Sequence, residues 1–167
     1  MTTVPSTHAK RNRRRLTTAV KESLRSLNLQ LALLNHQVGG RLALKDVDLD
    51  CLDLIAQHGL LSPSALARHA GLHPATLTGI LDRLERAGWI ARDRHPSDRR
   101  AVTLRVLPDR GAEIFRLYAG MNGRLDRICA RYTEAELDVI ADFLRRTTTA
   151  GTEATDDLSQ VSPSDSD

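Results

Sequence analysis

The sequence predicts a mainly α-helical fold with one small β-hairpin. Apolar residues recur at intervals of three and four along most of the 167 residues, which is the period of a helix with one buried face. Aromatic residues make up only 3% of the chain, and a core of Leu, Ile, Val and Ala suits helices better than an aromatic-rich sandwich. The period changes to strict alternation only between Trp89 and Leu107, which predicts the two strands.

The first predicted helix covers residues 13–38. Its apolar stripe consists of Leu16, Val20, Leu24, Leu27, Leu31, Leu34 and Val38. Gly39 and Gly40 are expected to end it, and residues 1–12 are expected to form a disordered basic lead. The stripe can be buried within one chain, or it can form a seam against another subunit.

The next segment predicts two short helices joined by a tight turn. A preceding helix is expected from about 48 to 59, with the carboxylates of Asp46, Asp48 and Asp50 near its positive end. Ser62 and Pro63 then open a helix that runs to Ala70, and Gly71 can adopt the left-handed turn that ends it. His73 and Pro74 open another helix of about four turns. Two helices in this arrangement are typical of a helix-turn-helix.

After Gly88 the stretches "WIARDR" and "AVTLRVL" each alternate apolar and polar residues on either side of "HPSD". This pattern predicts two antiparallel strands with a proline-bearing turn between them. Helix, turn, helix and hairpin in this order predict a winged helix-turn-helix over residues 46–107.

Two further helices are predicted at residues 108–131 and 134–148, the second opened by a capping box of Thr133 and Glu136. Residues 151–167 are rich in Ser, Thr and Asp and are expected to form a disordered acidic tail. The folded part is then 13–150. Its flanking helices, 13–38 and 108–148, carry more apolar surface than one winged region can cover, so we expect a twofold homodimer.

The charge of the chain favours a polyanionic partner. The last 17 residues carry five acidic groups and no basic ones, whereas residues 1–150 carry 24 basic and 16 acidic groups, a net charge of +8. Nucleic acid is favoured over a membrane. Without an apolar run of 18 residues or a secretory signal, we expect no membrane contact and a cytoplasmic location. No motif for a metal, a cofactor or catalysis is present, so no enzyme is expected.

The candidate DNA contacts lie on the second helix of the helix-turn-helix and on the hairpin. The first residues of such a helix enter the major groove, where small side chains and threonines can contact base edges. Arg83 is placed to contact phosphate, and a narrow hairpin can present arginine to the minor groove. The full set is His73, Pro74, Ala75, Thr76, Thr78, Arg83, Arg94, Asp98, Arg99 and Arg100.

The stretch "LARHAGLHPATLTGILDRLERAGWIARDRHPSDRRAVTLRVLPDRG" resembles the central pattern of the MarR family of winged-helix transcription regulators. The family's Asp-x-Arg wing motif falls on Asp98 and Arg100, which implies that Arg100 reaches the minor groove. Where the family has a threonine after its wing, this chain has Pro108, which can still start a helix. The resemblance implies a homodimer, commonly a repressor, on a pseudo-palindromic operator, with a small lipophilic or phenolic effector.

One alternative of a different class remains open. A winged helix can serve as a protein-interaction module whose apolar stripes bind a partner while the wing is idle. This alternative predicts weak DNA binding that does not distinguish sequences, and the DNA-binding hypothesis predicts the opposite.

Overall fold

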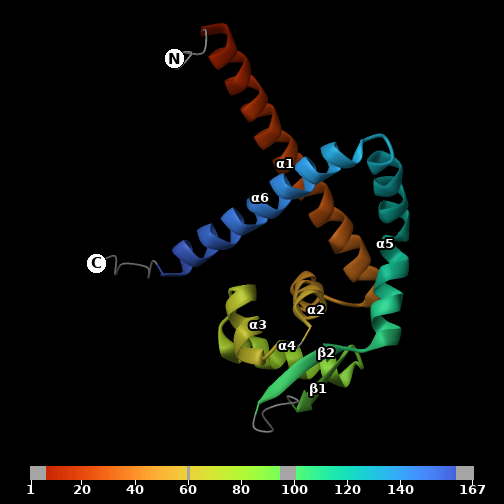
Figure 1. Ribbon diagram of the computed structural model, residues 1–167. Helices are drawn as coiled ribbons and strands as arrows, with labels where there is room; N and C mark the ends of the chain where they lie inside the picture. Colours follow the sequence, from red (N-terminus) through yellow and green to blue (C-terminus); the bar gives the residue numbers. More distant parts are fainter. Residues whose placement is uncertain (1–6, 60, 95–100, 161–167) are drawn as a thin grey trace. The chain divides into compact units, whose positions relative to one another are not determined.

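The computed structural model describes residues 7–59, 61–94 and 101–160 (Figure 1). The helices are α1 Thr7–Leu42, α2 Asp46–His58, α3 Pro63–Ala70, α4 Pro74–Arg86, α5 Pro108–Cys129 and α6 Glu134–Gln160, and the strands are β1 Ile90–Arg94 and β2 Val102–Val106. The mainly α-helical fold with one hairpin is therefore confirmed. The chain divides into two compact units at residue 49, within α2.

Helix α1 is longer than the sequence predicted at both ends. It begins at Thr7, since residues 7–12 contain no proline or glycine and include good helix formers. It also continues past Gly39 and Gly40, and the chain turns only at Ala43, whose φ is 54°. A Cβ on Gly39 would lie 3.0 Å from the Leu44 carbonyl oxygen. Gly39 therefore permits a close approach of the chain and does not end the helix.

The carboxylates at the start of α2 behave as the sequence predicted. Asp46 and Asp48 lie in its first turn, and the Asp48 side chain accepts a hydrogen bond from the Lys45 backbone N–H at 3.1 Å. His36 Nδ1 lies 3.1 Å from the Asp46 carboxylate. The Asp48 bond satisfies a backbone donor at the helix start, and the Asp46 contact joins the side chains of α1 and α2.

The second unit contains the predicted winged helix-turn-helix. Ser62 Oγ caps α3 by accepting from the Ala65 N–H at 3.2 Å, and Gly71 ends that helix with a φ of 62°. β1 and β2 pair antiparallel, with Ile90 opposite Val106 and Arg94 opposite Val102. The Leu104 N–H also donates to the Leu61 carbonyl at 2.9 Å, which attaches the hairpin to the chain two residues before α3.

The apolar core of this unit is aliphatic apart from Cys51 and Trp89. Its buried hydrophobic residues are Cys51, Leu52, Ile55, Leu61, Leu66, Ala67, Leu77, Ile80, Leu81, Leu84, Trp89, Ile90 and Leu104. Burial of each large side chain contributes roughly 1.5–3 kcal/mol. Because four of these residues come from α4, the core fixes how that helix is rotated about its axis.

Helices α5 and α6 follow the hairpin. The capping box of α6 is confirmed, since the Thr133 N–H donates to Glu136 Oε2 at 2.8 Å and the Glu136 N–H donates to Thr133 Oγ1 at 3.3 Å. The Thr133 hydroxyl also donates to Glu136 Oε2, at 2.9 Å, and the two bonds that this carboxylate accepts from the Thr133 N–H and hydroxyl lower the pKa of Glu136 below its ordinary value. Within the described ranges, no helix has the length and apolarity needed to cross a bilayer.

The prediction of disorder from residue 151 is wrong for residues 151–160, because α6 continues to Gln160. Threonines along this part of the helix satisfy their hydroxyls locally. Thr147, Thr148, Thr149, Thr152 and Thr155 each donate to the carbonyl four residues earlier, at 2.9–3.2 Å. A polar composition is therefore compatible with helix here. Residues 161–167 lie outside the described residues.

Candidate nucleic-acid interface

Helix α4 has one buried and one exposed face. Leu77, Ile80, Leu81 and Leu84 are at most 4% exposed. Ala75, Thr76, Thr78 and Gly79 are exposed. The face that carries the small residues is thus available to a ligand without disturbing the core.

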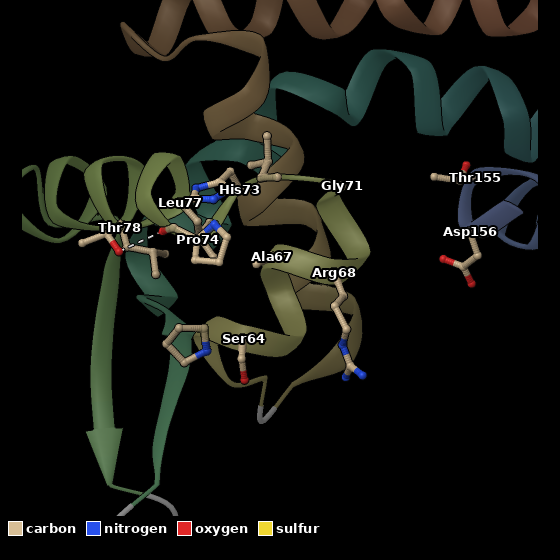
Figure 2. Close-up of a pocket in the computed structure, with 13 residues that line it drawn as sticks. Ser64, Ala67, Arg68, Gly71, His73, Pro74, Leu77, Thr78, Thr155 and Asp156 are labelled. Atoms are coloured by element: carbon tan, nitrogen blue, oxygen red, sulfur yellow. Dashed lines mark hydrogen bonds between the residues drawn. The ribbon is translucent and has the colours of Figure 1, made fainter. Parts of the chain in front are cut away.

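The start of α4 is held by local hydrogen bonds. His73 is the N-cap, and its Nδ1 accepts from the Ala75 N–H at 3.3 Å. Thr78 Oγ1 donates to the Pro74 carbonyl at 3.0 Å, drawn as a dashed line in Figure 2. Because this bond uses the only hydroxyl hydrogen, Thr78 offers a ligand its oxygen lone pairs and its methyl group. Those groups match an amino group on a base edge and a thymine methyl.

No described residue packs closely enough on Gly79 to require a glycine there. A Cβ built on Gly79 would meet none of the described residues within 4 Å, and glycine inside a helix is less favourable than alanine by about 1 kcal/mol. Its exposed position on α4 leaves the backbone open to close approach from outside. This property suits a helix that lies in a DNA groove.

An ion-pair cluster joins β1 to α4. The Arg92 guanidinium contacts Asp82 at 2.6 Å and Glu85 at 3.0 Å. Arg86 lies outside this cluster and donates from Nε to the Asp82 backbone carbonyl at 3.1 Å. The cluster fixes the hairpin against the helix, although its partly exposed side chains limit its contribution to stability.

The other described hairpin cations differ in their surroundings. Arg105 on β2 contacts Asp93 on β1 at 2.8 Å, across the strand pair. Arg94, at the end of β1, is exposed. Of the predicted contacts, Asp98, Arg99 and Arg100 fall outside the described residues, so their placement at the wing tip stays a prediction.

Arg110 connects the start of α5 to the segment that follows α4. Its guanidinium carbon lies 4.6 Å from the centre of the Trp89 ring. The same side chain contacts Glu113 at 2.8 Å and the Ala87 carbonyl at 3.4 Å. A cation over an indole face is a stabilising geometry. The contact connects the first turn of α5 to the residues that end α4.

The structure brings together His73, Pro74, Ala75, Thr76 and Thr78 on the first two turns of α4, whereas Arg83 lies further along and is half-buried. Sequence reasoning missed the positioning residues Arg92, Asp82, Glu85 and Arg110. Their partners on other elements lie seven or more residues away in the sequence, so no helical spacing indicates them. Only the folded hairpin and helix bring them into contact.

A surface pocket of about 660 Å³ adjoins the start of α4 (Figure 2). Its walls include Ala67 and Arg68 of α3, together with Pro74, Leu77 and Thr78 of α4. Thr155 and Asp156 of α6 also line it. The volume lies in the range of small-molecule sites.

Comparison with known proteins gives consistent results. The sequence profile of the MarR family matches residues 44–102. The chain is 31% identical over 120 residues to the HTH-type transcriptional regulator YcgE of Bacillus subtilis, covering 72% of this chain and 78% of that protein. It is 29% identical to the B. subtilis HTH-type transcriptional repressor YetL, covering half of each chain. A MarR family protein of Bacillus stearothermophilus shares the fold, with a TM-score of 0.63 and 21% identity over 83% of this chain and 97% of that one.

Proposed function

This chain belongs to the MarR family of DNA-binding transcriptional regulators, and we propose that it acts as a homodimeric, ligand-responsive repressor on a pseudo-palindromic operator. One observation carries the proposal. The first two turns of α4 expose Ala75, Thr76 and Thr78 while the opposite face of the helix is buried in the core. That surface is small enough to enter a major groove and is rigidly oriented.

The exposed residues define the expected type of base recognition. Alanine and the threonine methyl groups fit thymine methyls, and the threonine oxygens accept hydrogen bonds from base amino groups. No Arg, Asn or Gln lies among the first six residues of α4, so we expect modest direct recognition supplemented by DNA shape. Arg83 and Arg94 would contact phosphates, and Arg100, with Asp98 and Arg99 beside it, would enter the minor groove.

Exposed apolar side chains support the homodimer. In α1 they include Leu16, Leu29 and Leu33, which are 50–57% exposed, and in the second unit Phe115 and Val139 are 66% and 69% exposed. Monomeric soluble proteins rarely expose large contiguous apolar patches, and the helical spacing of the exposed Leu16, Val20, Leu27 and Leu31 places them along one stripe of α1. A twofold dimer would place two copies of α4 about 34 Å apart, one turn of DNA.

Two observations support the regulatory part of the proposal. The relative YetL is named a transcriptional repressor. The pocket beside α4 has apolar and charged walls, including Leu77 and Arg68, which suit a small lipophilic or phenolic compound. A ligand there would disturb the residues that face the groove and release the DNA.

The test is fluorescence anisotropy with DNA from upstream of the gene and with a scrambled duplex of equal length. The variant Thr76→Val/Thr78→Val removes two hydroxyls while keeping the side-chain shape. We expect it to lose about 1–3 kcal/mol of preference for the upstream DNA. Thr149→Val is the matched control, since Thr149 makes the same bond to a carbonyl four residues earlier. A wild-type protein that binds both duplexes equally would refute the proposal.

A further inference from the structure

The first half of α1 carries an unusual concentration of positive charge. Residues 10–25 contain seven basic side chains and one acidic side chain, Glu22. All of the basic side chains are exposed on a regular helix. They are Lys10, Arg11, Arg13, Arg14, Arg15, Lys21 and Arg25, and we name this segment the basic arm.

The cations of the basic arm have no acidic partner among the described residues. Across the described ranges, none of the seven pairs with a carboxylate, and Arg15 donates to the neutral Asn12 side chain at 3.2 Å. Three cations around α4 and the hairpin differ, because Arg92, Arg105 and Arg110 each contact a carboxylate within 3.0 Å. The part of the chain that the structure describes therefore leaves the positive charge of the arm uncompensated.

This arrangement opposes the stability of the helix. Five of the seven cations lie in residues 10–15, near the positive end of the α1 dipole, where cations are unfavourable. The first turn contains no acidic residue. Lys10 is spaced three and four residues from Arg13 and Arg14, so like charges are neighbours on the helix surface. A bound polyanion would remove both penalties.

We propose that the basic arm is a second, sequence-independent contact of this protein with the phosphate backbone of duplex DNA. The inference rests on the proposed DNA-binding function. Lys10, Arg13, Arg14 and Lys21 border one surface depression together with Thr17 and Thr18. From Lys10 to Lys21 the helix rises about 16 Å, a length that spans several phosphates of one DNA strand.

The composition of the arm favours DNA over a lipid surface. Five of its seven cations are arginines, whose planar guanidinium binds phosphate oxygens in pairs. Residues 7–25 contain no Trp, Phe or Tyr, the residues that anchor helices at a membrane interface. The apolar residues Leu16 and Val20 continue the stripe that runs along the rest of α1, so a second copy of the chain is their expected partner.

The test measures how the affinity for the upstream DNA depends on salt. Each lost phosphate contact should reduce the slope of log affinity against log salt by about 0.9. Arg13→Gln/Arg14→Gln should therefore reduce it by about 1.8 per protomer, with the ratio of upstream to scrambled DNA unchanged. Circular dichroism verifies that the variant is folded.

Arg145→Gln/Arg146→Gln is the matched control, because it removes the same charge from adjacent arginines on an exposed helix. Both arginines contact Asp142, at 3.5 and 2.8 Å, and the slope should stay at the wild-type value.

Three results would overturn the inference. One is a slope of log affinity against log salt that is the same for Arg13→Gln/Arg14→Gln and for the wild type, while specific binding is intact. Another is an equal reduction in the control variant. The third is wild-type sedimentation with phosphatidylglycerol vesicles that the arm variant loses while its DNA slope is unchanged, which would assign the arm to a bilayer. Failure of the proposed function is distinct, since it appears as a wild type without preference for the upstream DNA.

Discussion

The two basic regions of this protein use their arginines in opposite ways. Around α4 and the hairpin, Arg92, Arg105 and Arg110 are held by carboxylates or by the Trp89 ring. In the basic arm the cations are exposed, and no carboxylate of residues 7–59, 61–94 or 101–160 pairs with them. Charge held by partners fixes the shape of a surface, whereas uncompensated charge supplies attraction without geometric precision. The first arrangement suits sequence recognition, and the second suits binding to any phosphate backbone.

The largest predicted effect comes from removing the support of α4. Leu84 is 1% exposed, and Leu84→Ala should lower the free energy of unfolding by about 2–5 kcal/mol. Specific DNA binding should fall with it. Leu158→Ala is the control, since Leu158 is 76% exposed and its truncation should change stability by at most about 0.5 kcal/mol. Equal effects in urea unfolding would contradict the assignment of α4 to the core.

Arg92→Ala should separate geometry from stability. Its ion pairs are partly exposed, so we expect a loss of about 1 kcal/mol or less in urea unfolding. The loss of affinity for the upstream DNA should be larger than the effect on stability, about tenfold, because the hairpin loses its ion pairs with α4. Arg92→Lys should give an intermediate affinity, since lysine cannot bridge two carboxylates as guanidinium does. An Arg92→Ala variant with wild-type affinity would show that the ion pairs between Arg92 and α4 do not contribute to DNA binding.

Neutralising arginines of the basic arm should stabilise the α1 helix, whereas removal of Arg92 should destabilise the protein. Arg13→Gln/Arg14→Gln removes three like-charge pairs at spacings of three and four, each destabilising by about 0.2–0.5 kcal/mol. We expect greater helicity by circular dichroism at low salt and no difference from wild type at 1 M salt, where the charges are screened. A loss of helicity at low salt would mean that these arginines stabilise α1.

The smallest predicted effect on stability comes from Asp53, a carboxylate that is partly buried. Burial raises the pKa of Asp53 above its ordinary value of 3.8, and Asp50 raises it further. The folded state therefore binds the proton more tightly, so ionised Asp53 destabilises it at neutral pH. Asp53→Asn should raise the Tm slightly at pH 7, and the gain should shrink as the pH falls toward 3.8.

Tyr118 offers a second measurement of the same charge. Burial raises the pKa of Tyr118 above 10.0, and Asp53 and Asp50 raise it further. In a Tyr132→Phe background, Asp53→Asn should lower the pH at which the Tyr118 phenolate absorbs. An unchanged titration would show that the two side chains do not interact.

The parts of this structure that the sequence predicted depend on local chemistry. The caps made by Ser62, Gly71 and the Thr133–Glu136 box all involve partners within four residues, so the local sequence is sufficient to predict them. The role of Gly39 depends on the Leu44 carbonyl after the chain has turned, and Arg92 needs the hairpin folded against α4. The wrong prediction of disorder for residues 151–160 rests on composition alone, which does not take account of the hydrogen bonds that threonines form within the helix. The wing residues Asp98, Arg99 and Arg100 stay a prediction from sequence and family resemblance.

The central claim is that α4 reads a major groove in two copies one DNA turn apart. The direct measurement is a footprint on the upstream DNA that combines hydroxyl-radical cleavage with methylation of guanine N7, which lies in the major groove. The account predicts two protected major-groove segments with centres about 10 base pairs apart, which Thr76→Val/Thr78→Val weakens and Arg13→Gln/Arg14→Gln leaves in place. Uniform protection along the fragment, or a single protected segment unaffected by the threonine changes, would contradict it.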